Sequence, residues 1–469
     1  MREWKMTAAD PMAPRISADA RAGRTNIADD QTWQLRLGKP EEPAVSLETR
    51  YGGRVGLVRL IPMWTIDARE VYQTQGYHQP PVLKAFAPDF LRLDAAITHS
   101  LPVTIEFWTM ESQAVGGRLI CQNTGDLPRT FQVGMSAGAA RETQALKMFF
   151  LSLENGEAAL QLARLPNLQP VLLVEGATGS GSNSRLSRTL TLAPGERAVI
   201  RWALGGLPER DASLGLAYKW LTDPDWDTQI AAIEARASAQ AQIETGRPEW
   251  DAALAWSQQL ILRSFLGPTG NLPHASFVTS RKINQGFAVG GAHAGGFSAA
   301  WGGQTVPDAL LIAPEVARSA PELAKGIVLN FLAVQRDDGW IDACPGLDGQ
   351  RANVLAPPLL ASLPSPRAKN VALVAAFSAK TVFFSARNVA SHAALFAKSS
   401  IFSASNAAFF AGISSGSASF AAFLVTFFAT FLAQLLPGER LSPLLFPVPE
   451  DISSPGLRPG VWQARPVMV

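Results

Sequence analysis

Cysteine, histidine and charged residues are all scarce in this chain of 469 residues. Cys121 and Cys344 lie far apart without CxxC spacing, which excludes a disulfide scaffold and a cysteine-rich zinc site. The five histidines form no HExxH pattern, so we expect no metal site, and we expect no cofactor. Charged residues make up only 17% of the chain and its net charge is +2, which argues against nucleic-acid binding as its role.

Acidic residues are missing from a long stretch toward the C-terminal end. Residues 365–436 contain no Asp, Glu, Trp or Tyr, but they hold 12 of the 24 phenylalanines, and Ala and Ser fill most of the rest. Residues 437–469 then carry prolines throughout. That composition is typical of a tail without a fixed fold, so we predict that 437–469 is disordered.

A long apolar run is missing from residues 1–31, which carry charges throughout. A secretory signal needs an apolar stretch of about 7–15 residues. We therefore predict a disordered leader and a cytoplasmic protein.

Residues 32–220 consist of short apolar runs separated by turn-forming residues. Runs such as GRVGLVRLIPMW and PVTIEFWTM are rich in β-branched and aromatic residues, and clusters such as QNTGDLPRT lie between them. Many short strands with turn signals between them are typical of an antiparallel β-sandwich. In LSRTLTLAPGERAVIRWAL, the Pro-Gly turn predicts a late pair of strands.

Residues 221–364 show helical patterns. TQIAAIEARASAQAQIET is rich in good helix formers and lacks Gly and Pro, and WDAALAWSQQLILRSFLG has apolar residues near helical spacing. A third helix is predicted in PELAKGIVLNFLAVQRDDG, where Pro321 suits the first turn. The apolar face of this third helix consists of Leu323, Ile327, Phe331 and Val334.

The stretch NFLAVQRDDGWIDACPGLDGQR runs from an amphipathic helix into acids, amides, glycines and a tryptophan. A connecting loop needs glycine and polar residues, but it does not need Trp340 between Asp338 and Asp342. An aromatic face packs well against the C–H face of a sugar ring, and the chain has 12 tryptophans. The stretch therefore favours a surface that binds carbohydrate.

Four motifs in this part of the chain carry a family resemblance. They are SRK at 280–282, WGGQTVPDA at 301–309, NFLAVQRDDGWID at 330–342 and GQRANVLAPP at 349–358. In their order and rough spacing they resemble the helical domain of bacterial (α/α)6-barrel, or six-hairpin, glycosidases. The likeness is greatest to the mannosyl-oligosaccharide glucosidase-like and amylo-α-glucosidase-like group, and it extends to about residue 364.

The resemblance implies a fold, an activity and a set of sugar contacts. The expected fold is an antiparallel β-sandwich followed by the first helical hairpins of an (α/α)6 toroid. The expected activity is hydrolysis of α-linked glucosyl or related carbohydrates. The residues expected to contact carbohydrate are Arg281, Lys282, Trp301, Gln304, Asp308, Asp338, Trp340, Asp342, Gln350 and Arg351.

Each of these residues also has a structural interpretation. Trp301 and Trp340 suit a buried aromatic position as well as a pocket wall. Gln304 and Asp308 suit a helix cap or turn, since an acid is favoured in the first turn of a helix. Asp342 and Arg351 suit a structural salt bridge, Asp338 suits a solvated helix end, and Arg281 and Lys282 suit surface charge.

The resemblance also shows what the chain lacks. Glycosidases use one carboxylic acid to protonate the leaving oxygen and a second carboxylate as base or nucleophile. In the family both come from the part of the barrel that would follow residue 364, and residues 365–436 contain no carboxylate side chain. We therefore name no catalytic residue and expect the chain to be inactive as written. The alternative is a non-catalytic carbohydrate-binding or membrane-anchored surface protein.

Three interpretations of the acid-free segment stay open. SFAAFLVTFFATFLAQLL, residues 419–436, has Phe at helical spacing and is nearly long enough to span a bilayer, and it is the only segment through which we expect membrane contact. Alternatively, Ala-Phe-Phe-Ser repeats arise when a GC-rich gene for a Lys/Ala-rich protein is read on the wrong strand. This predicts a barrel truncated by a frameshift, a chimaeric assembly or a mispredicted gene. The third interpretation is a separate folded domain.

Overall fold

The computed structural model describes residues 2–25, 30–141, 144–180, 184–268, 272–278, 304–335 and 341–345. By internal contacts the chain divides into Met1–Arg387 and Asn388–Val469, and every described residue belongs to the first unit. The segments 365–436 and 437–469 lie outside the described residues, as does the apolar run 419–436. No helix in the described part is long and apolar enough to cross a membrane.

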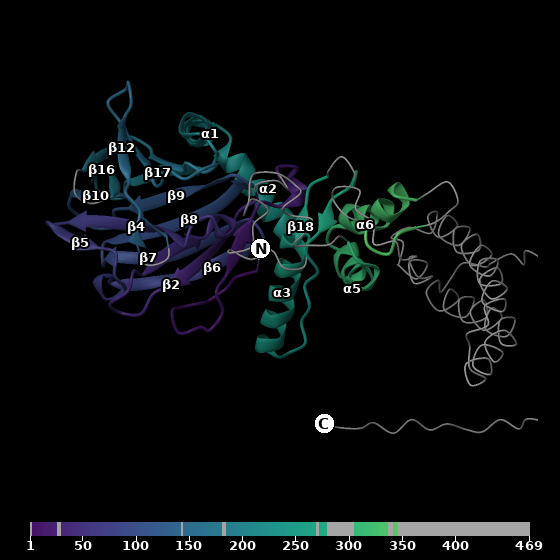
Figure 1. Cartoon of the computed structure of the whole chain (residues 1–469). Helices are drawn as coiled ribbons and strands as arrows, with labels where there is room; N and C mark the ends of the chain where they lie inside the picture. The colour runs from purple at the N-terminus through teal and green to yellow at the C-terminus, as the bar shows by residue number, and fades with distance from the viewer. Residues whose placement is uncertain are drawn as a thin grey trace, which may run out of the picture. The chain divides into compact units, whose positions relative to one another are not determined.

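The described residues before Arg210 form two large antiparallel sheets (Figure 1). Nine described strands form the first sheet. Its main path runs in the order β1 (Arg15–Ser17), β2 (Thr32–Leu37), β3 (Val45–Thr49), β4 (Leu57–Ile66), β10 (Arg129–Arg141), β16 (Arg185–Leu192) and β15 (Thr178–Ser180). The other two strands are β5 (Arg69–Val71), which pairs with β4, and β11 (Gln144–Ala145), which pairs with β10. Single turns of 3-10 helix, η1 (Ala20–Ala22), η3 (Tyr51–Gly53) and η4 (Thr74–Gly76), lie in its connections.

Eight described strands form the second sheet. Its order is β12 (Phe149–Ser152), β13 (Ala158–Gln161), β14 (Val171–Val174), β17 (Arg197–Gly205), β9 (Ala114–Gln122), β8 (Leu101–Glu111), β7 (Phe90–Thr98) and β6 (Gln79–Ala87). From β6 to β9 each strand pairs with the one before it, because short turns join consecutive antiparallel strands.

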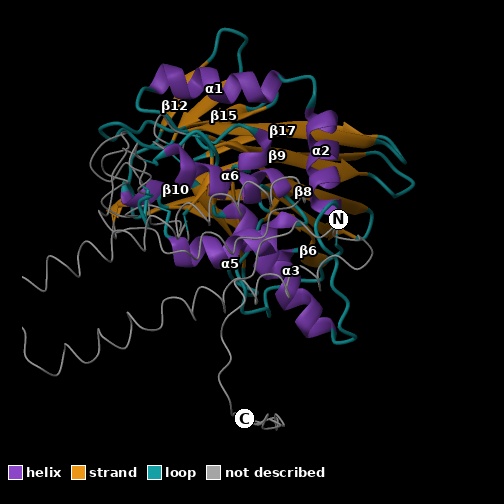
Figure 2. Ribbon diagram, turned by 90° about the vertical axis from the view of Figure 1, so that its right-hand side faces the viewer, coloured by secondary structure: helices purple, strands orange, loops and turns teal. Residues whose placement is uncertain are grey.

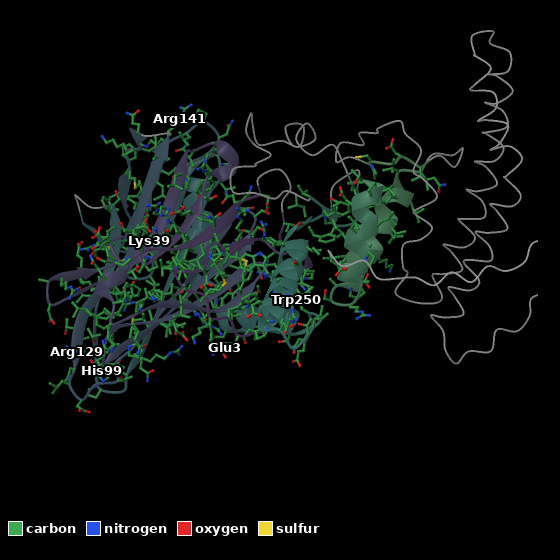
Figure 3. The ribbon with its side chains drawn as sticks, turned by 90° about the horizontal axis from the view of Figure 1, so that it is seen from below. Glu3, Lys39, His99, Arg129, Arg141 and Trp250 are labelled. Atoms are coloured by element: carbon green, nitrogen blue, oxygen red, sulfur yellow. The ribbon has the colours of Figure 1, made fainter. Side chains whose placement is uncertain are left out.

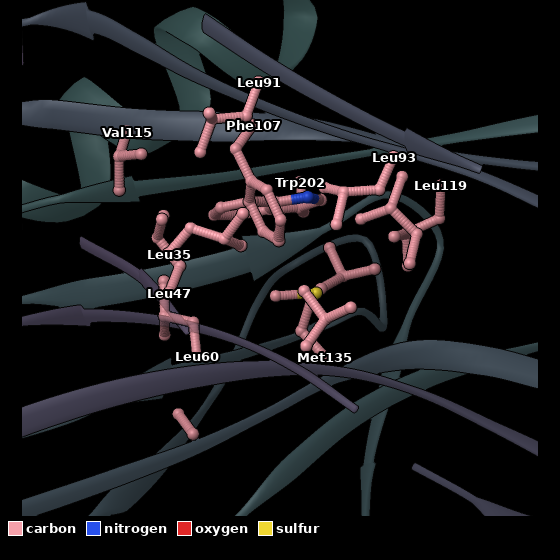
Figure 4. Packing of buried hydrophobic residues seen from close by; sticks show 14 of the residues in the cluster. Leu35, Leu47, Leu60, Leu91, Leu93, Phe107, Val115, Leu119, Met135 and Trp202 are labelled. Carbon is pink, nitrogen blue, oxygen red and sulfur yellow. The ribbon is translucent and has the colours of Figure 1, made fainter. Parts of the chain in front are cut away.

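The two sheets enclose one apolar core (Figure 4). Successive side chains of a strand point to opposite faces, so each strand contributes alternate residues to this core. Leu35, Leu47 and Leu60 come from the first sheet, and Phe107 and Trp202 come from the second; all five are almost fully buried. The core confirms the antiparallel β-sandwich that the alternating runs predict.

Two helices, α1 (Arg210–Thr222) and α2 (Trp226–Ser238), pack on the outer face of the eight-stranded sheet (Figure 2). Trp108 of β8 lies edge-to-face against Trp220 of α1 and Trp226 of α2, with ring centroids 5.4 and 5.7 Å away. Both helices thereby bury apolar stripes against a sheet face that would otherwise be exposed.

A third apolar cluster joins α3 (Pro248–Arg263), α5 (Val306–Ala317) and α6 (Pro321–Ala333) with the short pair β18 (Phe265–Leu266) and β19 (Ser276–Phe277). The predicted helix from Pro321 is confirmed, and Leu323, Ile327 and Phe331 are buried. Further hairpins of the expected toroid would fall outside the described residues, so that part of the fold stays a prediction.

The interpretation of residues 1–31 as a disordered leader is wrong for the residues that the structure describes. Trp4, Met6 and Ile16 belong to the sandwich core, and β1 pairs with β2. Trp4 contacts Phe86 and Trp256 edge-to-face, with ring centroids 6.0 and 6.1 Å away. The sequence of this charged segment does not indicate the packing, because its few apolar residues are scattered and their partners come from distant parts of the chain.

Two local expectations also differ from the structure. The strands on either side of the Pro-Gly turn, β16 and β17, do not pair, because β16 belongs to the first sheet and β17 to the second. The helix expected in TQIAAIEARASAQAQIET begins earlier, at Trp226, and ends at Ser238, while α1 precedes it inside the segment predicted as β.

Candidate functional site

The start of α5 brings together two of the sequence motifs. Thr305 is the N-cap residue, and its Oγ1 accepts a hydrogen bond of 3.2 Å from the backbone N–H of Asp308. The Thr305 hydroxyl also donates to Oδ2 of Asp308 at 2.6 Å. A hydroxyl cap with an acid three residues on satisfies backbone donors that a helix start leaves open, and Pro307 fits the first turn.

Gln304, just before this cap, is completely buried. Its backbone N–H donates to the carbonyl of Pro345 at 2.8 Å, and its side-chain Nε2 donates to the carbonyl of Ile327 in α6, also at 2.8 Å. The Oε1 atom is buried and accepts no hydrogen bond within the described part of the chain. Gln304 therefore connects the start of α5 to α6 and keeps one acceptor for a further donor.

Asp342 is completely buried beside this junction. Its Oδ1 accepts a hydrogen bond of 2.8 Å from the backbone N–H of Cys344, and the N–H of Val306 donates to the carbonyl of Ala343 at 3.1 Å. Residues 304–306 and 343–345 thus lie side by side. Two stretches that are far apart in the sequence meet at the N-terminal end of one helix.

Neither cysteine is suited to nucleophilic chemistry. Burial raises the pKa of the half-buried Cys344 thiol, and the carboxylates of Asp342 and Asp308 raise it further. Burial raises the pKa of Cys121 to about 12. Because the thiolate is the reactive form, both thiols stay protonated and unreactive near neutral pH.

The structure brings three of the ten predicted site residues together, namely Gln304, Asp308 and Asp342. The remaining seven lie outside the described residues: Arg281, Lys282, Trp301, Asp338, Trp340, Gln350 and Arg351. The three described residues all make contacts within the fold, as a cap, a helix connector and a turn. Their contact with carbohydrate stays a prediction.

Asn330 begins one of the four motifs but is not among the residues expected to contact carbohydrate. It lies on α6, completely buried, and its Oδ1 accepts from the N–H of His274 at 3.0 Å. Its Nδ2 donates to the carbonyls of His274 and Ala275. A sequence signal exists, because Asn330 lies between Ile327 and Phe331 on an otherwise apolar helix face. Within the described part of the chain, no three His, Cys, Asp or Glu residues cluster as metal ligands.

Comparisons with known proteins report low similarity only. No family model and no curated protein matches the sequence. Among solved structures, a protein described as a kojibiose phosphorylase from the human microbiome is 9% identical, with a TM-score of 0.38 over 74% of this chain and 54% of that one. A bacterial glucoamylase complexed with acarbose is 10% identical, with a TM-score of 0.39 over 75% of this chain and 56% of that one.

A shorter protein, described as an aldose 1-epimerase from Escherichia coli, is 8% identical over 42% of this chain and all of its own, with a TM-score of 0.25. The chain spans about half the length of the phosphorylase and the glucoamylase.

Proposed function

We propose that this protein is glycosidase-like, of the six-hairpin class, and binds α-linked glucosyl or related carbohydrates through the junction of residues 304–308 with 341–345. One observation carries the proposal. Gln304 and Asp308 from one motif and Asp342 from another are brought to the start of the same helix. A binding pocket formed by convergent polar groups from separate segments requires such a meeting point.

The chemistry of the junction suits hydroxyl groups. A carboxylate accepts several hydrogen bonds, so Asp308 keeps acceptor capacity at Oδ1 while Oδ2 is bonded to Thr305. Gln304 keeps Oε1 as a further acceptor. A sugar hydroxyl is a donor that would bond to the partly exposed carboxylate of Asp308, whereas the buried Oε1 of Gln304 lies beneath the surface of the junction.

We further propose that the chain does not hydrolyse glycosides. The reaction needs an acid and a second carboxylate on opposite sides of the scissile bond. Residues 365–436 supply neither, and Asp342 is held by the backbone of Cys344. We assign a catalytic role to none of the described carboxylates.

Binding and turnover are tested separately on the full chain. Maltotetraose should bind in isothermal titration calorimetry, and Asp308→Asn should weaken it about tenfold, because a hydrogen bond to a charged group contributes about 1.5–3 kcal/mol. Glu315→Gln, an exposed change on the same helix, is the control. An absence of binding would refute the carbohydrate role. Hydrolysis of an aryl α-glucoside above a mock preparation would refute the inactive interpretation.

Resequencing the gene across codons 350–380 tests the origin of the acid-free segment. A corrected frame that continues with helical hairpins and two loop carboxylates would identify a glycosidase whose catalytic residues belong to the restored part. A confirmed frame would exclude the familiar catalytic pair from residues 365–436. The membrane-anchored interpretation of residues 419–436 would then be tested by carbonate extraction.

A further inference from the structure

The outer face of the eight-stranded sheet contains a hollow of about 670 Å³, away from the junction described above. This volume is within the range of about 300–1,000 Å³ that is typical of ligand sites. Five neighbouring strands line it, from β6 to β17. The residues that matter to its chemistry are Lys84, Asp94, Thr104, Ile120, Gln122 and Arg197.

The register of the strands explains why charged, polar and apolar side chains lie side by side in the hollow. Asp94 pairs with Thr104, and Thr104 pairs with Ile120, so these three side chains lie in a row across the sheet. The next outward-facing row includes Gln122, whose partner on β17 is Arg197. Side chains two residues apart on a strand share a face, and neighbouring strands are about 4.8 Å apart. The rows therefore form a continuous patch.

The side chains in the row on the other side of the hollow form ion pairs within the fold. There Glu106 accepts hydrogen bonds from Arg92 and Arg118, which in turn pair with Glu234 and Asp227 of α2. These charges hold α2 on the sheet. They also separate the hollow from the tryptophan cluster under α1.

The cations of the hollow are paired far less completely. Among the described residues, no carboxylate lies within ion-pair distance of the exposed Arg197. Lys84 has a single partner, the exposed Glu3, at 3.5 Å. Asp94 accepts a hydrogen bond of 2.9 Å from the hydroxyl of Thr104, so its charge is turned toward a neutral group. The hollow thus offers Arg197 without a carboxylate partner among the described residues, Lys84 with one exposed partner, one carboxylate and polar neutral groups.

We propose that this hollow binds an acidic oligosaccharide, one whose sugars carry carboxylate groups. A planar guanidinium matches a carboxylate with two parallel hydrogen bonds, which suits Arg197 to a uronate. Asp94, Thr104 and Gln122 suit sugar hydroxyls, and Ile120 suits a C–H face. Among the described lining residues there is no Trp, Tyr or Phe, so the stacking that a neutral sugar would use is not offered.

The spacing of the cations favours an oligosaccharide over a single sugar. The strands of Lys84 and Arg197 are separated by three others, which corresponds to about 19 Å between their backbones at four spacings of about 4.8 Å. One sugar ring cannot reach both cations. Several linked rings can, with carboxylates near both ends of the hollow.

Calorimetric titration of the full chain with tetragalacturonate tests the proposal. Saturable binding is expected, and maltotetraose and inorganic phosphate at equal ionic strength should not compete. Arg197→Gln should weaken binding at least about tenfold, and Lys84→Gln should weaken it less. The matched control is Arg141→Gln, an exposed arginine on the nine-stranded sheet. Figure 3 shows Arg141 at the opposite end of the sandwich from His99, whose ring contacts His78 of the hollow.

The outcomes separate this site from the junction at α5. Asp308→Asn should leave tetragalacturonate binding unchanged, even if it abolishes binding of maltotetraose. Three results would overturn the proposal: no saturable binding of tetragalacturonate, equal binding by Arg197→Gln and the parent chain, or equal competition by phosphate. All substituted positions are exposed or partly exposed, and an unchanged near-ultraviolet circular dichroism spectrum confirms that each variant is folded.

Discussion

Arg236 of α2 donates a hydrogen bond of 2.9 Å to the buried carboxylate of Asp89, which lies in the turn between β6 and β7. The same guanidinium lies 3.6 Å from Asp19, which also pairs with Arg21. Two arginines and two aspartates thus join the N-terminal segment, the second sheet and α2 in one buried cluster. Burial opposes the charge on Asp19, but Arg21 and Arg236 outweigh it and lower its pKa.

The stability of the protein should depend on pH through Asp89. Burial and the nearby Asp19 raise the pKa of Asp89 from 3.8 to about 7, against the opposing effect of Arg236. A raised pKa means that the folded state holds the proton more tightly than the unfolded state does. The free energy of unfolding should therefore fall as pH rises from about 4 to about 7, by up to about 4 kcal/mol, and level off above.

Urea unfolding at several pH values measures this slope. Asp89→Asn should remove most of it, because an amide cannot ionise, while Asp126→Asn in an exposed loop should leave it unchanged. Asp19 does not interfere, since its lowered pKa makes its contribution disappear only as pH falls below about 4. An identical slope in Asp89→Asn and the parent would contradict the prediction.

Glu106 should be essential for holding α2 on the sheet. It is 2% exposed and accepts hydrogen bonds from both Arg92 and Arg118. Glu106→Gln would leave these two guanidinium groups without their buried counter-charge, which should cost about 3–5 kcal/mol. The partner on α2, Glu234, is 43% exposed, so Glu234→Gln should cost no more than about 1 kcal/mol. Equal losses in thermal unfolding would show that the buried bridge is unimportant.

Gly117 of β9 should tolerate no side chain. A methyl group there would overlap the carbonyl oxygen of Glu106 on β8 and crowd the indole of Trp202. Gly117→Ala should therefore destabilise the protein by about 1–3 kcal/mol or more. Gly138 of β10 provides the control, because a methyl group at this position meets nothing within 4 Å. Its alanine variant should stay within about 0.5 kcal/mol of the parent.

Gln304 should stabilise the packing of α5 against α6. Gln304→Leu removes the donor to the carbonyl of Ile327, which should cost about 1–2 kcal/mol. The expected result is faster amide hydrogen exchange in α5 and α6, with the sandwich unaffected. Glu315→Gln, on the exposed side of α5, should change nothing. Unaltered exchange in the leucine variant would mean that this hydrogen bond contributes little.

The sandwich could be predicted from sequence because its evidence is local. Alternating apolar residues and turn formers recur along 32–220, and the alternation within each strand shows which of its side chains face the core. The strand partners are not local. Around the Pro-Gly turn at Pro194 and Gly195 the sequence suits a hairpin, yet β16 pairs with β10 and β17 with β9. Which sheet a strand joins depends on strands far away in the sequence, because Leu192 pairs with Arg129 and Arg197 pairs with Gln122.

The candidate site was predictable only in part. The cap of Asp308 follows from the Thr-x-x-Asp spacing. The contact of Asp308 and Asp342 with carbohydrate stays a prediction. The sequence contains no comparable pattern that would predict the hollow on the sheet. Its residues are ordinary outward-facing positions of five strands, and only the register of those strands places Arg197, Gln122 and Asp94 in one patch.

The packing of Trp4 has a consequence for biosynthesis. Its indole lies against Phe86 of the sheet and Trp256 of α3, so its binding place is complete only when α3 has left the ribosome. Trp4 is thus made long before α3 and completes its packing only after α3 is available. Contacts of such long sequence separation slow folding, because the chain must close a long loop before they form. During translation, the apolar site for Trp4 would stay open to chaperones.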